Sequence, residues 1–104
     1  MTDQPFRVVV QGHDHKVEAR FFGDLTIEAE DALTTAFRAA DLAARPPVVI
    51  DFGMVPHVNS AGIAALMGIL VWLRERTAGI KFVGLNRHLE KVFRMTGFPT
   101  LVTM

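Results

Sequence analysis

The sequence predicts one α/β domain over residues 1–104, with a mixed, mostly parallel β-sheet, helices packed on it and the element order ββαβαβαβ. Two strand-like segments separated by a short turn open the chain and predict a hairpin, which makes the sheet mixed. After them, short β-branched runs alternate with longer segments of helical periodicity. Strands separated by single helices imply right-handed crossovers and parallel pairing. A chain of 104 residues suits one domain that buries roughly 65% of its unfolded surface.

The first half of the chain is expected to hold the hairpin and one helix. Strands are predicted over residues 6–11 and 16–22, and apolar and charged residues alternate in the second, as in a strand with one wet face. A helix is predicted over residues 25–44, because apolar residues recur along one of its faces. Pro46 and Pro47 end it.

The second half alternates strands and helices, with turn residues between them. Asn86 and Gly97 bracket the last helix as N-terminal cap and stop signal. The expected elements are, in order, a buried strand over residues 48–52, a helix from Ser60 to about Thr77, a strand over 80–85, a helix over 87–95 and a last strand over 100–103.

Composition excludes several classes of function. Half of the residues are hydrophobic and 21% are charged, which suits a packed globule, and there is no cysteine for disulfides, thiol catalysis or cysteine metal sites. Net charge is zero and basic residues are scattered, so no nucleic-acid partner is expected. The start of the chain lacks the pattern of a signal peptide. The longest apolar run, residues 61–73, is shorter than the ~20 residues of a membrane span. We therefore expect a cytoplasmic protein without direct membrane insertion.

Ser60 stands at the turn between the buried strand and the following apolar helix. Free N–H groups and the positive end of the helix dipole stabilise added negative charge at such a position. A phosphate could therefore be mounted on Ser60, although an ordinary helix cap explains a serine there equally well. Asn59 can be explained either as a residue that favours the turn conformation or as a contact for a partner protein. Gly62 fits close approach of a partner backbone or relief of crowding in the first turn.

The helix after Ser60 is apolar nearly all round, whereas a helix on one face of a sheet should show a polar outer stripe. Its buried face cannot include every large apolar residue, so Met67 and Val71 are candidates for an exposed, partner-binding patch. The alternative is that neighbouring helices cover them.

The segment Val58-Asn59-Ser60-Ala61-Gly62, preceded by the strand that contains Asp51, resembles the signature of the STAS domain family, which contains the bacterial anti-sigma factor antagonists. The order of elements resembles that family over nearly the whole chain. In phosphorylated members the acceptor is the serine of an Asp-Ser-(Ser/Ala)-Gly turn. Ser60 aligns with that acceptor and Ala61 and Gly62 fit the pattern, while Asn59 replaces the usual aspartate. Many members also continue into a final helix beyond the position of Met104.

The resemblance implies a binding module rather than an enzyme, with no cofactor of its own. Its unphosphorylated form would bind a serine kinase that doubles as an anti-sigma factor, through Asn59, Ser60, Ala61, Gly62, Met67 and Val71. Phosphorylation of Ser60 would end binding and a serine phosphatase would restore it, with ATP and Mg²⁺ belonging to the kinase. The alternative is a constitutive, unphosphorylated STAS subunit of a lipid-transport or stress-sensing complex.

The histidines do not indicate catalysis or metal binding. His13 and His15 share a turn without a third ligand at a recognisable spacing, so a solvated surface is expected. His57 precedes Ser60 by three residues, but the first glycine of a Gly-x-Ser-x-Gly elbow is missing. A serine hydrolase is therefore not expected. An ATPase is not expected either, because the chain has no glycine-rich phosphate loop.

Overall fold

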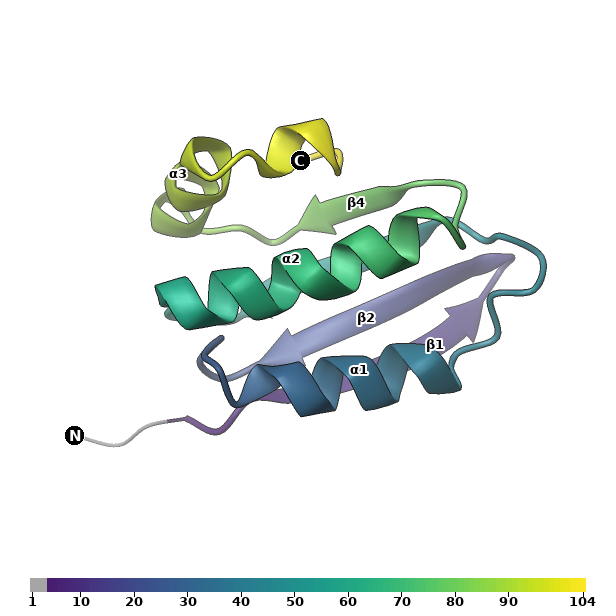
Figure 1. The fold of residues 1–104 in the computed structure, drawn as a ribbon, viewed down its shortest axis with the longest axis horizontal. Helices are drawn as coiled ribbons and strands as arrows, with labels where there is room; N and C mark the ends of the chain where they lie inside the picture. The colour runs from purple at the N-terminus through teal and green to yellow at the C-terminus, as the bar shows by residue number, and fades with distance from the viewer. Residues whose placement is uncertain (1–3) are drawn as a thin grey trace.

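The sheet has four strands in the order β1-β2-β3-β4 (Figure 1). The computed structural model describes residues 4–104. β1 and β2 pair antiparallel, and the other two pairs are parallel, so the predicted mixed α/β sheet is confirmed. The strands are β1 (Arg7–His13), β2 (Lys16–Phe22), β3 (Val48–Met54) and β4 (Ile80–Val83).

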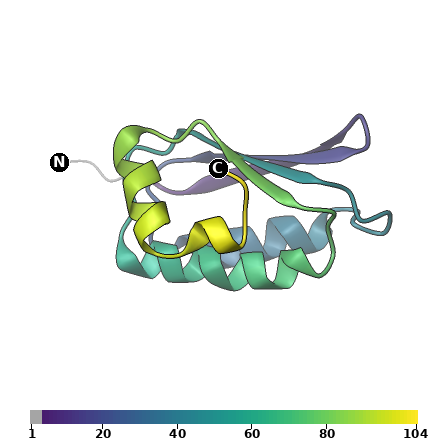
Figure 2. The ribbon, with the colours of Figure 1, turned by 90° about the horizontal axis from the view of Figure 1, so that it is seen from above.

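The helices lie on one face of the sheet, and no helix of residues 4–104 covers the other face (Figure 2). α1 and α2 run side by side under the sheet, and α3 lies at its end, beyond β4. The uncovered face carries charged side chains, among them Glu18, Arg20 and Lys81. The helical elements are α1 (Ala29–Ala39), α2 (Ser60–Arg74), α3 (Arg87–Met95) and the short 3₁₀ helix η1 (Phe98–Thr100).

The core lies between the sheet and these helices. Alternate residues of β2 and β3 are buried and face α1 and α2, while α1 contributes the predicted apolar stripe of Ala29, Leu33 and Phe37. Aromatic rings extend the core to α3: Phe52 and Phe93 pack with ring centroids 5.3 Å apart. This packing fixes the carboxyl end of β3, from which the Ser60 turn leaves.

Three helix boundaries differ from the prediction over residues 25–44 and 60–77. α1 ends at Ala39, because the backbone of Ala40 is already extended, so Pro46 and Pro47 do not end it as predicted. α1 begins only at Ala29, because Leu25 is buried against the Ser60 turn. α2 ends at Arg74, where the guanidinium of Arg76 donates a hydrogen bond to the carbonyl of Trp72 in the last turn at 2.8 Å. A cation that binds the last carbonyls of a helix is a favourable stop.

The predicted last strand over residues 100–103 is reduced to one parallel bridge between Lys81 and Thr103. η1 takes up residues 98–100 and turns the chain back toward β4. Thr103 then exchanges hydrogen bonds with both neighbours of Lys81: its carbonyl accepts the N–H of Phe82 at 2.8 Å and its N–H donates to Ile80 at 2.9 Å. Within residues 4–104, no helix has the length and apolar character needed to cross a membrane.

Candidate binding and phosphorylation site

Asn59 caps helix α2. Its side-chain Oδ1 accepts a hydrogen bond from the N–H of Gly62 at 2.9 Å, and its carbonyl accepts one from the N–H of Ile63 at 2.9 Å. Its backbone is extended, as expected for a capping residue. A helix cap was one interpretation of Ser60 in the sequence, but the capping role belongs to Asn59.

Ser60 is exposed at the first helical position and leaves its hydroxyl free. Among the described residues, none forms a hydrogen bond with that hydroxyl or with the backbone N–H of Ser60 or Ala61. The first turn of α2 also contains no acidic residue, so no side chain within it offsets the positive end of the dipole. Ser60 is the only serine in the sequence. Its hydroxyl is thus available for modification without the loss of a structural hydrogen bond.

Replacing each residue of this turn by alanine should separate the two roles. Asn59→Ala should lower the free energy of unfolding by about 1 kcal/mol, the usual value of a lost cap, and lower the melting temperature by roughly 4–8 °C. Ser60→Ala should change the melting temperature much less, because no hydrogen bond is lost. Thermal unfolding followed by circular dichroism measures both. An equal loss in Ser60→Ala would mean that the serine, too, is structural.

Gly62 lets the backbone of Leu25 pass directly over the first turn of α2. A Cβ on Gly62 would lie 1.9 Å from the Leu25 carbonyl oxygen and 2.8 Å from the N atom of Thr26. Leu25 is held there by a hydrogen bond from its N–H to the carbonyl of His57 at 3.0 Å and by a parallel bridge with Val58. The predicted close approach at Gly62 is therefore made by this chain's own loop. Because Gly62 is buried, it shapes the turn from inside.

The outer face of α2 carries the exposed apolar surface. Val71 is 55% exposed, whereas Met67 is half-buried and packs against the core. Ala64 and Gly68 are exposed on the same helix. The exposed apolar patch expected on this helix is therefore centred on Val71. The buried face consists of Leu66, Ile69, Leu70 and Leu73.

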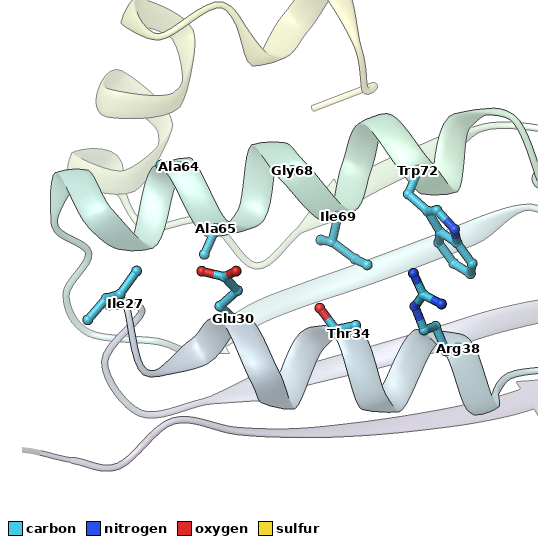
Figure 3. Close-up of a pocket in the computed structure, with 9 residues that line it drawn as sticks. All are labelled: Ile27, Glu30, Thr34, Arg38, Ala64, Ala65, Gly68, Ile69 and Trp72. Carbon is cyan, nitrogen blue, oxygen red and sulfur yellow. The ribbon is translucent and has the colours of Figure 1, made fainter.

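A groove of about 370 Å³ runs between α1 and α2 beside this surface (Figure 3). Ile27, 57% exposed, lies at one end of the groove near Ala65 and Glu30. Arg38 and Trp72 meet at the other end, with the guanidinium carbon 5.6 Å from the ring centroid. Sequence reasoning missed Ile27 as a surface residue because it placed this position inside a helix. A signal was present: Thr26 is a good helix-start residue, and its hydroxyl accepts the N–H of Glu28 at 3.3 Å.

The histidines lie outside this arrangement or take part only through the backbone. His13 and Asp14 form an exposed pair at 3.0 Å on the hairpin turn. His57 is exposed, and its carbonyl holds the Leu25 loop. Within residues 4–104, no group of three histidine or acidic side chains is placed to hold a metal ion.

Several solved structures share the fold. An anti-sigma factor antagonist from Mycobacterium paratuberculosis superposes with a TM-score of 0.74 at 23% identity, covering 93% of this chain and 82% of that one. The anti-sigma factor antagonist SpoIIAA in its unphosphorylated form superposes with a TM-score of 0.59 at 20% identity, covering 86% of this chain and 82% of that one. The Bacillus cell fate determinant SpoIIAA in its phosphorylated form superposes with a TM-score of 0.58 at 22% identity, covering 94% of this chain and 88% of that one.

Comparison with curated proteins gives no significant match. The family comparison, in contrast, covers almost the whole chain: the family described as "Mlab, STAS domain" matches residues 8–103. The match includes the capped Ser60 turn, α2 and every strand except the first residue of β1. The chain therefore belongs to the STAS domain family, and its fold is that of the anti-sigma factor antagonists.

Proposed function

We propose that this domain is a protein-binding module whose affinity for a partner is switched by phosphorylation of Ser60. The observation that carries the proposal is that Asn59, not Ser60, caps α2. The usual structural reason for a serine at a helix start is thereby absent, and its exposed hydroxyl faces the solvent beside an apolar helix surface.

The electrostatics of the turn favour a switch that acts on binding rather than on folding. A phosphate adds about −1.5 to −2 charges at pH 7. At the start of α2 it would meet the positive end of the dipole and the free N–H groups of Ser60 and Ala61, an interaction typically worth about 0.3–1 kcal/mol. The domain would stay folded, while a partner docked on Ser60 and Val71 would meet new charge and bulk.

The partners follow from the family resemblance. The unphosphorylated domain would bind a serine kinase that acts as an anti-sigma factor, and a serine phosphatase would reverse the modification. SpoIIAA, whose fold this chain shares, has been solved in both an unphosphorylated and a phosphorylated form. One fold thus accommodates both states in that protein, which supports the same two states here. The kinase supplies ATP and Mg²⁺, and the domain itself needs no cofactor.

Phosphorylation of the purified domain by its kinase tests the proposal. We expect one phosphate per chain on Ser60, located by peptide mass spectrometry, and no labelling of Ser60→Ala. Thr26→Ala is the matched control, because Thr26 is half-buried beside the same turn, and it should be labelled like the natural protein. Persistent labelling of Ser60→Ala would refute the assignment. Thr77 is a poor competing acceptor, since it is only 4% exposed.

A constitutive subunit of a larger complex is the second candidate, and Asn59 is the observation that favours it. An amide at this position caps the helix but lacks the charge of the usual aspartate. The same kinase assay distinguishes the two functions. If the natural protein is never labelled but Asn59→Asp is, the domain is an unphosphorylated STAS subunit that binds through the same helix face.

A further inference from the structure

The groove between α1 and α2 has a floor of mostly small and apolar side chains. Both helices begin at the same end of the groove and run parallel along it (Figure 1, Figure 3). Ala65, Gly68 and Ile69 of α2 line its middle, opposite Thr34 of α1. α3 and η1 lie on the other side of α2, away from α1 (Figure 1). No described helix or strand therefore covers the groove.

The two ends of the groove carry opposite charges. Glu30 lies toward the end where the helices begin, and Arg38 lies at the end where they finish, two turns later on α1 and about 12 Å along its axis. Neither side chain forms an ion pair with another described residue. Arg76, whose guanidinium carbon lies 4.2 Å from the ring centroid of Trp72, adds positive charge at the Arg38 end. Both charges are thus available to a partner.

We propose that the groove holds an amphipathic helix of the partner protein, antiparallel to α1 and α2, with acidic residues against Arg38 and basic residues against Glu30. This docking rests on the proposed function, because it takes the domain to be a protein-binding module, and it names the element of the partner that the domain holds. Laying the apolar face of a helix into a groove is a recurring mode of recognition. A basic residue two turns after an acidic one lies on the same helix face, about 11 Å further along, which matches the spacing of Arg38 and Glu30.

Helix dipoles favour the antiparallel orientation. The carboxyl ends of α1 and α2, which carry partial negative charge, lie together at the Arg38 end. The start of a helix carries partial positive charge and is stabilised by acidic side chains. An antiparallel helix brings this start, with its acidic residues, to the end where α1 and α2 finish. A parallel helix with the same pattern would instead bring its acidic residues to Glu30 and its basic residues to Arg38.

Gly68 gives the groove room for a second backbone. It is exposed on α2, has no atom within 4 Å of where its Cβ would be, and does not adopt a positive φ. Glycine inside a helix costs about 1 kcal/mol relative to alanine, and no contact among residues 4–104 requires glycine here. Close approach of a docked helix explains it. Ile27, 57% exposed at one end of the groove, adds apolar surface for the same helix.

Two synthetic peptides test the docked helix and its orientation. Each has about 15 residues, enough to form a helix, with leucines along one face and no tryptophan. The first has glutamates in its first turn and lysines in its last turn, and the second has these charges exchanged. Trp72 is the only tryptophan of the domain and lines the groove, so its fluorescence reports binding. The natural domain should bind the first peptide at least tenfold more tightly than the second.

Exchanging the charges of the groove should reverse this preference, so that Glu30→Lys combined with Arg38→Glu binds the second peptide more tightly. Asp31→Lys combined with Arg74→Glu is the matched control. It makes the same charge changes in the first turn of α1 and the last turn of α2, at exposed residues that do not line the groove, and it should keep the natural preference.

Absence of binding by either peptide, equal binding of both, or a preference that the exchanged charges do not reverse would each overturn the inference. This titration involves neither kinase nor phosphate. Its failure would therefore leave the proposed function standing.

Gly68→Leu tests whether the partner kinase uses the same groove. The added side chain should weaken kinase binding at least tenfold without lowering the melting temperature, because the space it enters is open in the free domain. Unchanged kinase binding would show that the helix of the partner docks elsewhere, even if phosphorylation of Ser60 still controls the affinity. Weakened binding supports the docked helix, whether or not phosphorylation of Ser60 changes the affinity.

Discussion

Gly62→Ala should destabilise the domain by about 3 kcal/mol, at the upper end of the usual cost of overpacking. The added methyl carbon would lie 1.9 Å from the carbonyl oxygen of Leu25 and 2.4 Å from its carbonyl carbon. Backbone atoms cannot swing away as the end of a flexible side chain can, so the Leu25 loop or the start of α2 must move. For a domain of this size the melting temperature should fall by roughly 12–24 °C.

Gly68→Ala is the matched control for this substitution. Gly68 lies six residues later on the same helix, is exposed, and has no atom within 4 Å of where its Cβ would be. Alanine there should raise the free energy of unfolding by about 0.5–1 kcal/mol, because glycine is unfavourable inside a helix. Chemical denaturation of both variants measures the difference. Similar losses at Gly62 and Gly68 would show that the close approach of Leu25 is not a feature of the folded protein.

Val71→Glu should weaken binding of the partner kinase at least tenfold, which corresponds to about 1.4 kcal/mol, while the melting temperature stays nearly unchanged. Val71 is 55% exposed, so a carboxylate there remains hydrated in the free domain and is desolvated only in the complex. Met67→Glu should also weaken binding but should destabilise the fold, because Met67 packs against the core. Titration calorimetry with the kinase measures the binding losses.

The same substitution on the other side of the molecule controls for charge. Val9 is 37% exposed on β1, and its register partner Arg20 lies on the uncovered face of the sheet. Val9→Glu should therefore leave kinase binding unchanged. Equal binding losses in Val9→Glu and Val71→Glu would mean that α2 is not the binding surface.

Elements with strong local signals could be predicted residue by residue. α3 spans the predicted residues 87–95, because Asn86 caps it through the N–H of Leu89 at 2.8 Å and Gly97 follows it in the left-handed conformation with φ 87°. Both signals act within a few residues of the helix end. The burial pattern of β2 likewise follows its alternating sequence.

Boundaries set by distant contacts could not be predicted in this way. Residues 25–28 have helical periodicity, but Leu25 packs against the Ser60 turn. Its N–H donates to the carbonyl of His57, and its carbonyl passes directly over Gly62. The segment that follows α2 is held by Arg45, which lies 30 residues before Glu75, whose carbonyl it binds. Neither contact produces a pattern that can be recognised in the residues next to the helix end.

The sequence located the candidate site, but it could not assign a role to each residue of the site. Asn59 and Ser60 are both good capping residues, so only the observed hydrogen bond to Gly62 assigns the cap to Asn59. The groove between α1 and α2 exists only after the two helices pack together. Ile27 at its rim therefore had no place in a prediction made element by element.

The affinity of the partner kinase for the two forms of the domain tests the proposed switch most directly. Titration of the kinase with the unphosphorylated domain and with the domain phosphorylated on Ser60 should show binding at least tenfold weaker for the phosphorylated form, with both forms equally folded by circular dichroism. Ser60→Asp, which carries part of the phosphate's charge, should fall between them. Equal affinity of the phosphorylated and unphosphorylated forms would contradict the proposal that charge on Ser60 controls binding.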